Sequence, residues 1–307
     1  MFNVFIDGSA GTTGLKIVDR LSKRSDINLI KLPEELRKDI NARKEALNSA
    51  DVAFLCLPDS AAIEAVSLVE SDKVKIIDTS TAHRTNNDWQ YGFAELEGMR
   101  EKIACSKRIA NPGCHASGFI ALINPLINAG VIDKNINLSC FSITGYSGGG
   151  KKMIAEYEDE NMPVNYQAPR QYGLTQNHKH LPEKQKYCSL QTLPIFCPIV
   201  SNYDCGMEVG IPLFAKDVKG GIEKVKEIYK NVYNGQIVKY IEQNDENGFL
   251  SANTLKGKDS MQITVIGNDD RMVLVSRFDN LGKGASGAAI QNMNILLGVD
   301  EKTGLVL

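Results

Sequence analysis

The first third of the chain alternates between short apolar runs and stretches with helical periodicity. Four apolar runs predict strands, at 2–7, 27–32, 51–57 and 73–78. The run at 51–57 is apolar throughout, which is typical of a strand buried on both faces. Helical patterns over 15–23 and 59–70 separate the strands, so the pattern predicts βαβ units and a parallel sheet. Residues 79–107 are irregular, and we expect them to wrap the carboxyl edge of that sheet.

The pattern changes in the second part of the chain. A long apolar helix is expected from Cys114 toward Gly130, with a kink at Pro125. Further strands are predicted at 137–144, 189–201, 206–214, 262–267 and 272–278. A helix at 222–233 lies among them, and a last helix is expected at 285–297. The predicted fold class is α/β: a parallel-sheet domain plus an α+β domain with a mostly antiparallel sheet.

Composition and charge narrow the class of protein. The 307 residues are enough for two domains, and 43% hydrophobic with 23% charged residues is typical of a soluble globular protein. A net charge of −2 argues against a nucleic-acid or membrane-surface binder. No apolar run is as long as a membrane span, and the N-terminus is predicted to be a strand rather than a signal peptide. We therefore expect neither a nucleic-acid nor a membrane partner, and the cysteines described next, as free thiols, fit a reducing cytoplasm.

One of the seven cysteines has a distinctive context. An odd number without a C-x-x-C pair argues against a disulfide framework and a zinc site, so no metal is expected. Cys56, Cys140 and Cys197 lie in apolar strand-like runs and are interpreted as packing residues. Cys114 instead follows the turn Asn111-Pro112-Gly113 at the start of a helix. Backbone N–H groups and the helix dipole favour a thiolate there, which makes Cys114 a candidate nucleophile.

His178 and His180 are the candidate bases. Two residues apart on an extended segment, they would point the same way. A metal site would need a third ligand that no neighbour clearly supplies. General base catalysis needs only one imidazole. The alternative is a surface loop that is merely polar.

A glycine-rich turn follows the first predicted strand and precedes a helix, as a dinucleotide site requires. The turn consists of Gly8, Ser9, Ala10, Gly11, Thr12, Thr13 and Gly14. Its spacing is G-x-x-G-x-x-G rather than G-x-G-x-x-G. After the second strand, Glu34 could bind a ribose 2′-OH and favour NAD, whereas Arg37 and Lys38 could pair with a 2′-phosphate and favour NADP. The residues leave that choice open.

A second glycine-rich segment, Gly145–Lys152, fits G-x-x-x-x-G-K. A P-loop needs Ser or Thr at position 152, where this chain has Lys152, so nucleotide hydrolysis is disfavoured. Such a loop with two lysines could still hold a phosphate or carboxylate, or be a flexible turn. Arg84, after the strand at 73–78, is another anion-binding candidate, and His83 beside it could be structural.

Elements along nearly the whole chain resemble the N-acetyl-γ-glutamyl-phosphate reductases of arginine biosynthesis, in their shorter form, and more distantly the aspartate-semialdehyde dehydrogenases. They are Gly8–Gly14, Asp78–Arg84, Tyr91–Leu96, Asn111–Cys114, Gly145–Gly150, His178–Glu183, Asp279–Gly287 and Gln291–Asn294. The resemblance implies an NADP-binding Rossmann domain at 1–114, completed by the C-terminal helix at 285–307, and a catalytic, substrate and oligomerisation domain at 115–284. It implies NADP as cofactor and a homodimer or homotetramer. His115 is a departure, because longer members often have Tyr there.

The resemblance also implies an activity: NADPH-dependent reduction of N-acetyl-glutamyl 5-phosphate to the 5-semialdehyde, with phosphate release, through a thioester on Cys114. His180 is favoured over His178 as acid/base, because Glu183 could orient it. Further cofactor contacts are expected from Arg37, Ser80, Gln291 and Asn292, although the last two could instead cap and pack their helix. Substrate contacts are expected from Arg84, Asn111, Ser147, Gly148, Lys151 and Glu183.

Three alternative functions remain at this point. The chain could reduce another acyl phosphate, such as aspartyl phosphate. It could be an NADP-binding redox sensor in which Cys114 signals without turnover. It could also be a cysteine hydrolase, which would not need the glycine turn.

Overall fold

The computed structural model describes residues 1–243 and 245–307 and divides into two compact units. Unit 1 comprises residues 1–112 and 285–305, and unit 2 comprises 113–284 and 306–307. The chain thus leaves unit 1 immediately before Gly113 and returns to it at Ala285. The domain boundaries expected from the sequence were 114/115 and 284/285.

Unit 1 contains a six-stranded parallel sheet with strand order β2-β1-β3-β4-β6-β5. The strands are β1 (Phe2–Asp7), β2 (Ile27–Ile30), β3 (Val52–Leu55), β4 (Lys75–Asp78), β5 (Gln90–Tyr91) and β6 (Arg108–Ala110). The four strands predicted in this region are confirmed, and β5 and α4 lie within the segment predicted to be irregular. The strand order reverses at β1 and β3, and in open α/β sheets ligands bind beyond the carboxyl ends of the strands at such a point.

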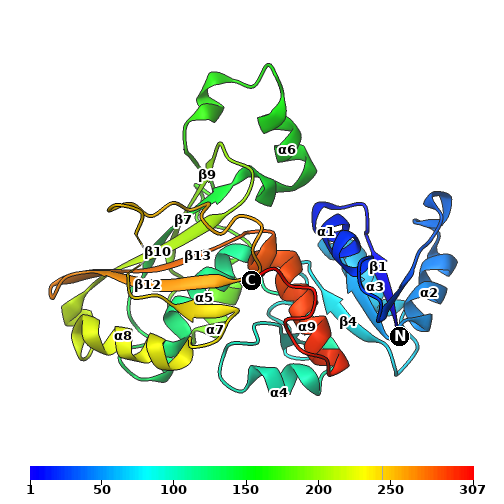
Figure 1. Cartoon of the computed structure of the whole chain (residues 1–307), viewed down its shortest axis with the longest axis horizontal. Helices are drawn as coiled ribbons and strands as arrows, with labels where there is room; N and C mark the ends of the chain where they lie inside the picture. The colour runs from blue at the N-terminus through cyan, green and yellow to red at the C-terminus, as the bar shows by residue number, and fades with distance from the viewer. Residues whose placement is uncertain (244) are drawn as a thin grey trace. The chain divides into compact units, whose positions relative to one another are not determined.

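Helices cover both faces of the unit 1 sheet, as alternating side chains require. These helices are α1 (Thr12–Leu21), α2 (Ile40–Ser49), α3 (Asp59–Ser67), α4 (Met99–Ala104) and α9 (Gly287–Leu297). Val4 and Phe54 pack in one cluster with residues of α1, α4 and α9. Phe5 and Leu55, next along the same strands, pack in the opposite cluster with residues of α2 and α3. The C-terminal helix is therefore part of unit 1, and Figure 1 shows it in red beside β4.

Unit 2 contains a seven-stranded mixed sheet with strand order β11-β12-β13-β10-β7-β9-β8. Its strands are β7 (Ser139–Gly145), β8 (Arg170–Gln171), β9 (Ile195–Ser201), β10 (Met207–Phe214), β11 (Val238–Tyr240), β12 (Met261–Gly267) and β13 (Arg271–Phe278). Adjacent strands are antiparallel except for β7–β9 and β11–β12. The predicted fold class, α/β with a mostly antiparallel second sheet, is confirmed.

The helix α5 (Cys114–Asn128) packs on one face of this sheet, with α7 (Leu181–Tyr187) and α8 (Gly221–Val232) beside it. The contact is close, since a Cβ on Gly118 would lie 2.6 Å from Val209 Cγ2. Pro125 lies inside α5 and has no N–H, so the carbonyl of Ala121 lacks its usual helical donor. The Tyr233 hydroxyl donates to that carbonyl at 2.6 Å. This bond replaces the one that the proline removes.

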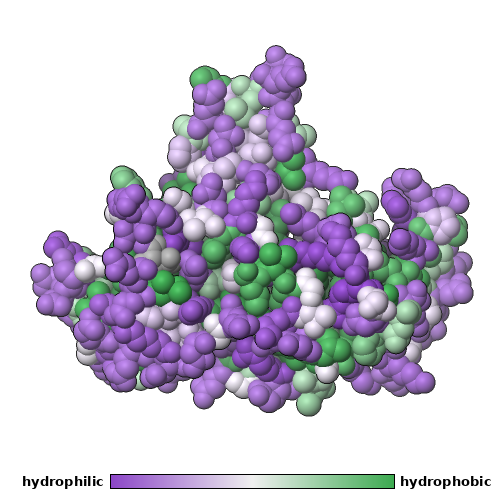
Figure 2. Space-filling model, viewed as in Figure 1, coloured by the Kyte–Doolittle hydropathy of each residue, from purple (hydrophilic) through white to green (hydrophobic). Residues whose placement is uncertain are grey.

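In unit 2, a short 3-10 turn, Tyr146–Gly149, follows β7 and leads into α6 (Gly150–Glu158). Figure 2 shows hydrophilic side chains over most of the surface around α8, whereas the surface around α6 is mixed. Within the described residues, no helix has both the length and the apolar character needed to cross a membrane.

Candidate active site

The glycine turn of unit 1 is built for close backbone approach. Gly8 has φ +84°, and a Cβ there would lie 2.3 Å from the Cys56 carbonyl oxygen. A Cβ on Gly14 would lie 2.5 Å from the Gly8 carbonyl oxygen. Gly11 is the N-cap of α1 and offers no capping side chain, so the N–H groups of the first helical turn have no side-chain acceptor from the N-cap. A backbone of this kind fits the pyrophosphate of a dinucleotide.

The residues proposed to select the cofactor lie beyond β2, where a short 3-10 helix spans Glu34–Leu36. The Arg37 side chain is 45% exposed and that of Glu34 is 88% exposed. Their closest charged atoms, Arg37 Nη1 and Glu34 Oε1, are 3.9 Å apart. An exposed pair at this separation is weakly coupled, so Arg37 is available to a ligand phosphate.

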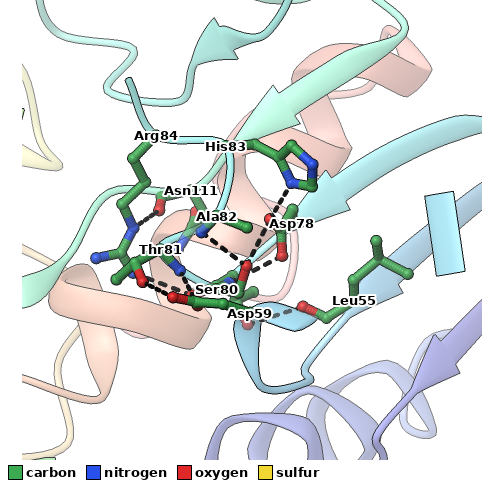
Figure 3. Close-up of polar contacts among 10 residues, drawn as sticks. Leu55, Asp59, Asp78, Ser80, Thr81, Ala82, His83, Arg84 and Asn111 are labelled. Carbon is green, nitrogen blue, oxygen red and sulfur yellow. Dashed lines mark hydrogen bonds and ion pairs between the residues drawn. The ribbon is translucent and has the colours of Figure 1, made fainter. Parts of the chain in front are cut away.

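A buried carboxylate organises the loop after β4, as Figure 3 shows. Asp78 is fully buried and accepts hydrogen bonds from the amide of Ser80 at 2.9 Å and from its hydroxyl at 2.7 Å. His83 Nδ1 lies 2.6 Å from the same carboxylate, and its ring stacks on Trp89 with 4.0 Å between centroids. Ser80 and His83 therefore fix the loop, which supports the structural interpretation of His83.

Arg84 is tied to the same loop (Figure 3). Its Nε donates to the carbonyl of Asn111 at 3.0 Å and its Nη2 to the carbonyl of Thr79 at 3.0 Å. The residue is only 8% exposed. In the Asn111 side chain, Nδ2 donates to the Ala285 carbonyl at 3.1 Å and Oδ1 accepts from Asn292 Nδ2 at 3.1 Å. Arg84 thus joins two loops of unit 1, and these bonds use part of its donor capacity.

Both amides of α9 that were expected near the cofactor contact protein groups. Gln291 Nε2 donates to Glu95 Oε1 and Glu301 Oε2, each at 2.9 Å. Asn292 Nδ2 donates to the Gly92 carbonyl at 2.9 Å. Each residue is at most 1% exposed. These contacts favour the alternative in which the two amides pack the helix.

Cys114 is the first residue of α5, as the sequence predicted, and it is half-buried. Its N-cap, Gly113, provides no capping side chain, and the Gly113 amide donates to Glu183 Oε2 at 3.1 Å. Burial raises the pKa of four other thiols, those of Cys56, Cys140, Cys188 and Cys205. The pKa is raised to about 12 for Cys56 and for Cys205. Cys114 is the cysteine that combines a helix N-terminus with access to solvent.

Glu183 connects the cysteine turn to His180. His180 is the N-cap of α7, and its Nε2 lies 3.9 Å from Glu183 Oε1. The Glu183 side chain is 1% exposed and that of His180 is 6% exposed. A buried carboxylate at this distance favours the protonated imidazole, so the pair can stabilise a proton taken up by His180.

The segment of His178 and His180 is not extended, as the prediction that the two side chains point the same way assumed, but both rings lie near the His115 ring, with centroids 5.7 and 5.5 Å from it. The segment is a turn, because the amide of His180 donates back to His178 Nδ1 at 3.1 Å. The two rings lie 4.8 Å apart at 76°. Burial, with smaller contributions from the nearby Lys184 and Lys179 charges, lowers the pKa of His178 to about 4. His178 is therefore neutral at pH 7, with one ring nitrogen already used as an acceptor.

Sequence reasoning missed three residues around these histidines, Ser142, Tyr172 and Lys184, and noted His115 only as a departure from longer family members. His115 Nδ1 lies 2.6 Å from Ser142 Oγ, and His115 Nε2 lies 2.7 Å from the Tyr172 hydroxyl. Lys184 is fully buried, with Nζ 3.4 Å from Cys140 Sγ and 3.3 Å from the centre of the Phe196 ring. No spacing rule connects these positions, because the contacts join segments far apart in sequence.

The segment 145–152 forms the 3-10 turn and the start of α6. Ser147 is buried and accepts a hydrogen bond from Asn280 Nδ2 at 3.1 Å, whereas Gly148 and Lys151 are exposed. The Lys152 side chain is 91% exposed and faces Glu156. Across the described residues, no group of three or more His, Cys, Asp or Glu side chains could hold a metal ion.

The chain matches two family profiles and resembles solved structures of one class of enzyme. The profile of the semialdehyde dehydrogenase NAD binding domain matches residues 3–105, and that of the semialdehyde dehydrogenase dimerisation domain matches residues 114–280. The fold is also that of aspartate semialdehyde dehydrogenase II of Vibrio cholerae, with a TM-score of 0.71 at 16% identity over 97% of this chain and 98% of the other. The enzyme of Candida albicans, solved with NADP, has a TM-score of 0.66 at 14% identity over 97% of this chain and 98% of the other. The class is therefore that of the semialdehyde dehydrogenases.

Sequence relatives identify the branch of this class. The chain is 46% identical to N-acetyl-gamma-glutamyl-phosphate reductase of Brucella ovis over 96% of its own length and 98% of the relative. The corresponding protein of Brucella canis matches to the same extent. The chain belongs to the N-acetyl-gamma-glutamyl-phosphate reductase family.

Proposed function

We propose that this protein reduces N-acetyl-glutamyl 5-phosphate to N-acetyl-glutamate 5-semialdehyde and phosphate, with NADPH as the reductant. The reaction is a step of arginine biosynthesis. The observation that carries the proposal is the position of Cys114 at the N-terminus of α5, with Glu183 joining its turn to His180. The similarity to reductases of this name along 96% of the chain gives the substrate.

The cysteine turn supplies the covalent step. The Cys114 thiolate attacks the carbonyl carbon of the acyl phosphate, and the C–O bond to phosphate breaks with its electron pair, leaving a thioester. NADPH, when bound, supplies the hydride that reduces this thioester. Collapse of the resulting adduct breaks the C–S bond, returns the electron pair to sulfur and releases the aldehyde. Two moderate barriers replace one high barrier.

His180 is the proposed acid/base. It would protonate the adduct oxygen and take that proton back as the aldehyde forms, with Glu183 stabilising the charged imidazole. His178 is less suited, because its Nδ1 accepts a backbone hydrogen bond and burial lowers its pKa to about 4. Such a group contributes roughly 10²–10⁴-fold to rate.

The glycine turn and Arg37 are the proposed dinucleotide contacts. The turn would take the pyrophosphate on backbone N–H groups at the start of α1. Arg37 would pair with the 2′-phosphate of NADP, because among the residues that the structure describes its exposed guanidinium has one charged partner, Glu34, at 3.9 Å. Exposed Lys151 and Gly148 remain proposed substrate contacts.

The reverse reaction tests the function directly. NADPH formation is followed from N-acetyl-glutamate semialdehyde and NADP⁺, with inorganic phosphate present and then omitted. Strict dependence on phosphate is expected, because phosphate must cleave the thioester. Phosphate-independent oxidation would contradict the proposal. A preference for aspartate semialdehyde in the same assay would assign the other acyl phosphate, and NADP binding without turnover would favour the redox sensor.

We also propose that the protein forms a homodimer or homotetramer through the sheet face opposite α5. The strand register places Phe141, Ile195, Phe214 and Ile266 on this face, and the last three side chains are 60%, 57% and 42% exposed. The family profile over residues 114–280 is a dimerisation domain. Light scattering should show Phe214→Glu reducing the mass, with Val164→Glu, 80% exposed on another segment, as the matched control. An unchanged mass would contradict this interface.

The seven free thiols support a reducing compartment, the cytoplasm.

A further inference from the structure

A buried chain of hydrogen bonds runs from the unit 2 sheet toward the proposed nucleophile. Ser142 lies on β7 and is fully buried, and its hydroxyl is 2.6 Å from His115 Nδ1. His115, the residue after Cys114, is 4% exposed. Its Nε2 is 2.7 Å from the hydroxyl of Tyr172, which follows β8. Both ring nitrogens of His115 are therefore used, so His115 is not available as a base.

The direction of the protons in this chain follows from donor and acceptor counts. Burial lowers the pKa of His115 well below its usual value, and Lys184 lowers it further, so the ring is neutral and has one N–H. Among the described residues, the Ser142 hydroxyl has one hydrogen-bond partner, His115 Nδ1. A neutral ring accepts from one hydroxyl and donates to the other, so one of the two hydroxyl protons lacks an acceptor in the protein. Ser142 is fully buried whereas Tyr172 is only half-buried, so Ser142 is the hydroxyl that donates to Nδ1. His115 then carries its proton on Nε2 and donates it to the Tyr172 oxygen.

This arrangement leaves the Tyr172 O–H proton unused. Within the described part of the chain, the Tyr172 hydroxyl makes one hydrogen bond, the one it accepts from His115. Burial raises the pKa of Tyr172, and the charge of the Cys114 sulfur raises it further, so the hydroxyl is protonated and within electrostatic reach of that sulfur. The other ionisable groups around His115 and Cys114 include His178, Lys179, His180, Glu183 and Lys184.

We propose that Tyr172 donates this proton in a hydrogen bond to the oxygen that becomes negatively charged on the carbon bonded to Cys114, and that His115 and Ser142 are positioning residues that hold the hydroxyl in that direction. The acyl oxygen lies one bond beyond the carbon that Cys114 attacks. The Tyr172 hydroxyl is hydrogen-bonded to His115, the residue after Cys114, and the Tyr172 ring centre lies 6.0 Å from that of His178, so the hydroxyl is placed for the oxygen rather than for the thiolate. The proposal rests on the proposed role of Cys114.

Two electrophiles that both react with Cys114 distinguish this role from activation of the thiol. p-Nitrophenyl acetate acylates a thiolate through a tetrahedral adduct with a charged oxygen and releases p-nitrophenolate. Iodoacetamide alkylates a thiolate by displacement of iodide, and no charged oxygen forms. Both reactions are measured on the full chain without NADPH, with Cys114→Ser as the background and peptide mass spectrometry to identify the modified cysteine.

Tyr172→Phe should slow acylation by about 10- to 100-fold, the scale of losing one hydrogen-bond donor to such an oxygen, and leave alkylation within about twofold. Tyr240→Phe is the matched control, because its buried hydroxyl has no hydrogen-bond partner among the described residues. His115→Gln should cause a smaller loss of acylation, and no further loss when added to Tyr172→Phe.

Three outcomes would overturn the proposal: acylation unchanged in Tyr172→Phe, equal slowing of both reactions, or a full additional loss from His115→Gln in the double variant. Equal slowing of acylation and alkylation would indicate that the Tyr172 hydroxyl activates the Cys114 sulfur itself. The readout uses neither the acyl phosphate nor NADPH. A wild-type protein that acylates normally but fails to reduce N-acetyl-glutamyl 5-phosphate would therefore contradict the proposed function alone.

Discussion

Replacing Glu183 by glutamine isolates the charge of the group that joins the cysteine turn to the proposed base. The amide oxygen of the new side chain would still accept the hydrogen bond that the Gly113 amide donates at 3.1 Å. What disappears is the negative charge 3.9 Å from His180 Nε2. The substitution therefore tests electrostatics at His180 with little change in the geometry of the Cys114 turn.

The magnitude follows from Coulomb's law. Two unit charges about 4 Å apart at an effective dielectric constant of 20 interact by about 4 kcal/mol. Relaxation of the site reduces the observed effect to roughly 2–4 kcal/mol, or about 30- to 1,000-fold in rate, at 1.36 kcal/mol per factor of ten. We expect kcat/KM for phosphate-dependent semialdehyde oxidation to fall by this factor, while the rate of Cys114 alkylation and the affinity for NADPH change little.

Glu156→Gln is a matched control for this experiment. Glu156 also lies 3.9 Å from a cation, Lys152 Nζ, but both side chains are exposed, so the loss of that charge should leave kcat/KM within about twofold. A Glu183→Gln enzyme with activity within threefold of the wild type would refute the role assigned to the carboxylate. A large loss in the Glu156→Gln variant would show that the effect is not specific to the site.

Three further predictions concern stability and cofactor choice. Burial raises the pKa of Glu208 to about 7, so its ionisation destabilises the fold as pH rises from its unfolded value of 4.5 through 7. At 1.36 kcal/mol per pKa unit, the stability gained by Glu208→Gln in urea denaturation should grow by about 2–3 kcal/mol between pH 5 and pH 8.5, and a constant difference would contradict the linkage. Tyr233→Phe should cost about 1–3 kcal/mol by leaving the Ala121 carbonyl without its donor, and clearly less in a Pro125→Ala background, where the helix regains its N–H. Equal costs in both backgrounds would show that the proline is irrelevant. Arg37→Ala should weaken NADPH binding by about 10- to 100-fold in a fluorescence titration and leave NADH binding unchanged, whereas equal weakening of both would remove Arg37 from the 2′-phosphate.

The sequence predicts elements best where apolar residues alone form the buried face. β1, β3 and β4 are such cases, because their side chains pack against helices on both sides of the sheet. The helix α2 was not predicted, because one of its three buried residues is Arg43, a charged residue that interrupts the apolar pattern of a helix. Arg43 is buried because it pairs with Asp7 at 3.0 Å, a contact with a different element of the fold.

The candidate site divides in the same way. Cys114 was predicted from local chemistry, a glycine turn followed by a helix, and it begins α5. The extended backbone assumed for His178 and His180 was wrong, because the His180 amide donates to the His178 ring and closes a turn that spacing alone does not indicate. His115 and Tyr172 are 57 positions apart and meet only when β7 and the segment after β8 are in place. Tertiary contacts of this kind leave no periodic signal in the sequence.

The central claim is that the sulfur of Cys114 carries the acyl group during reduction. It is tested most directly by comparing Cys114→Ser with the wild type in phosphate-dependent NADPH formation and, on the same samples, in NADPH binding by fluorescence. The account predicts turnover below about 1% of the wild type, because a hydroxyl is a far weaker nucleophile than a thiolate, with NADPH affinity within about twofold. Substantial turnover by the serine variant would contradict it.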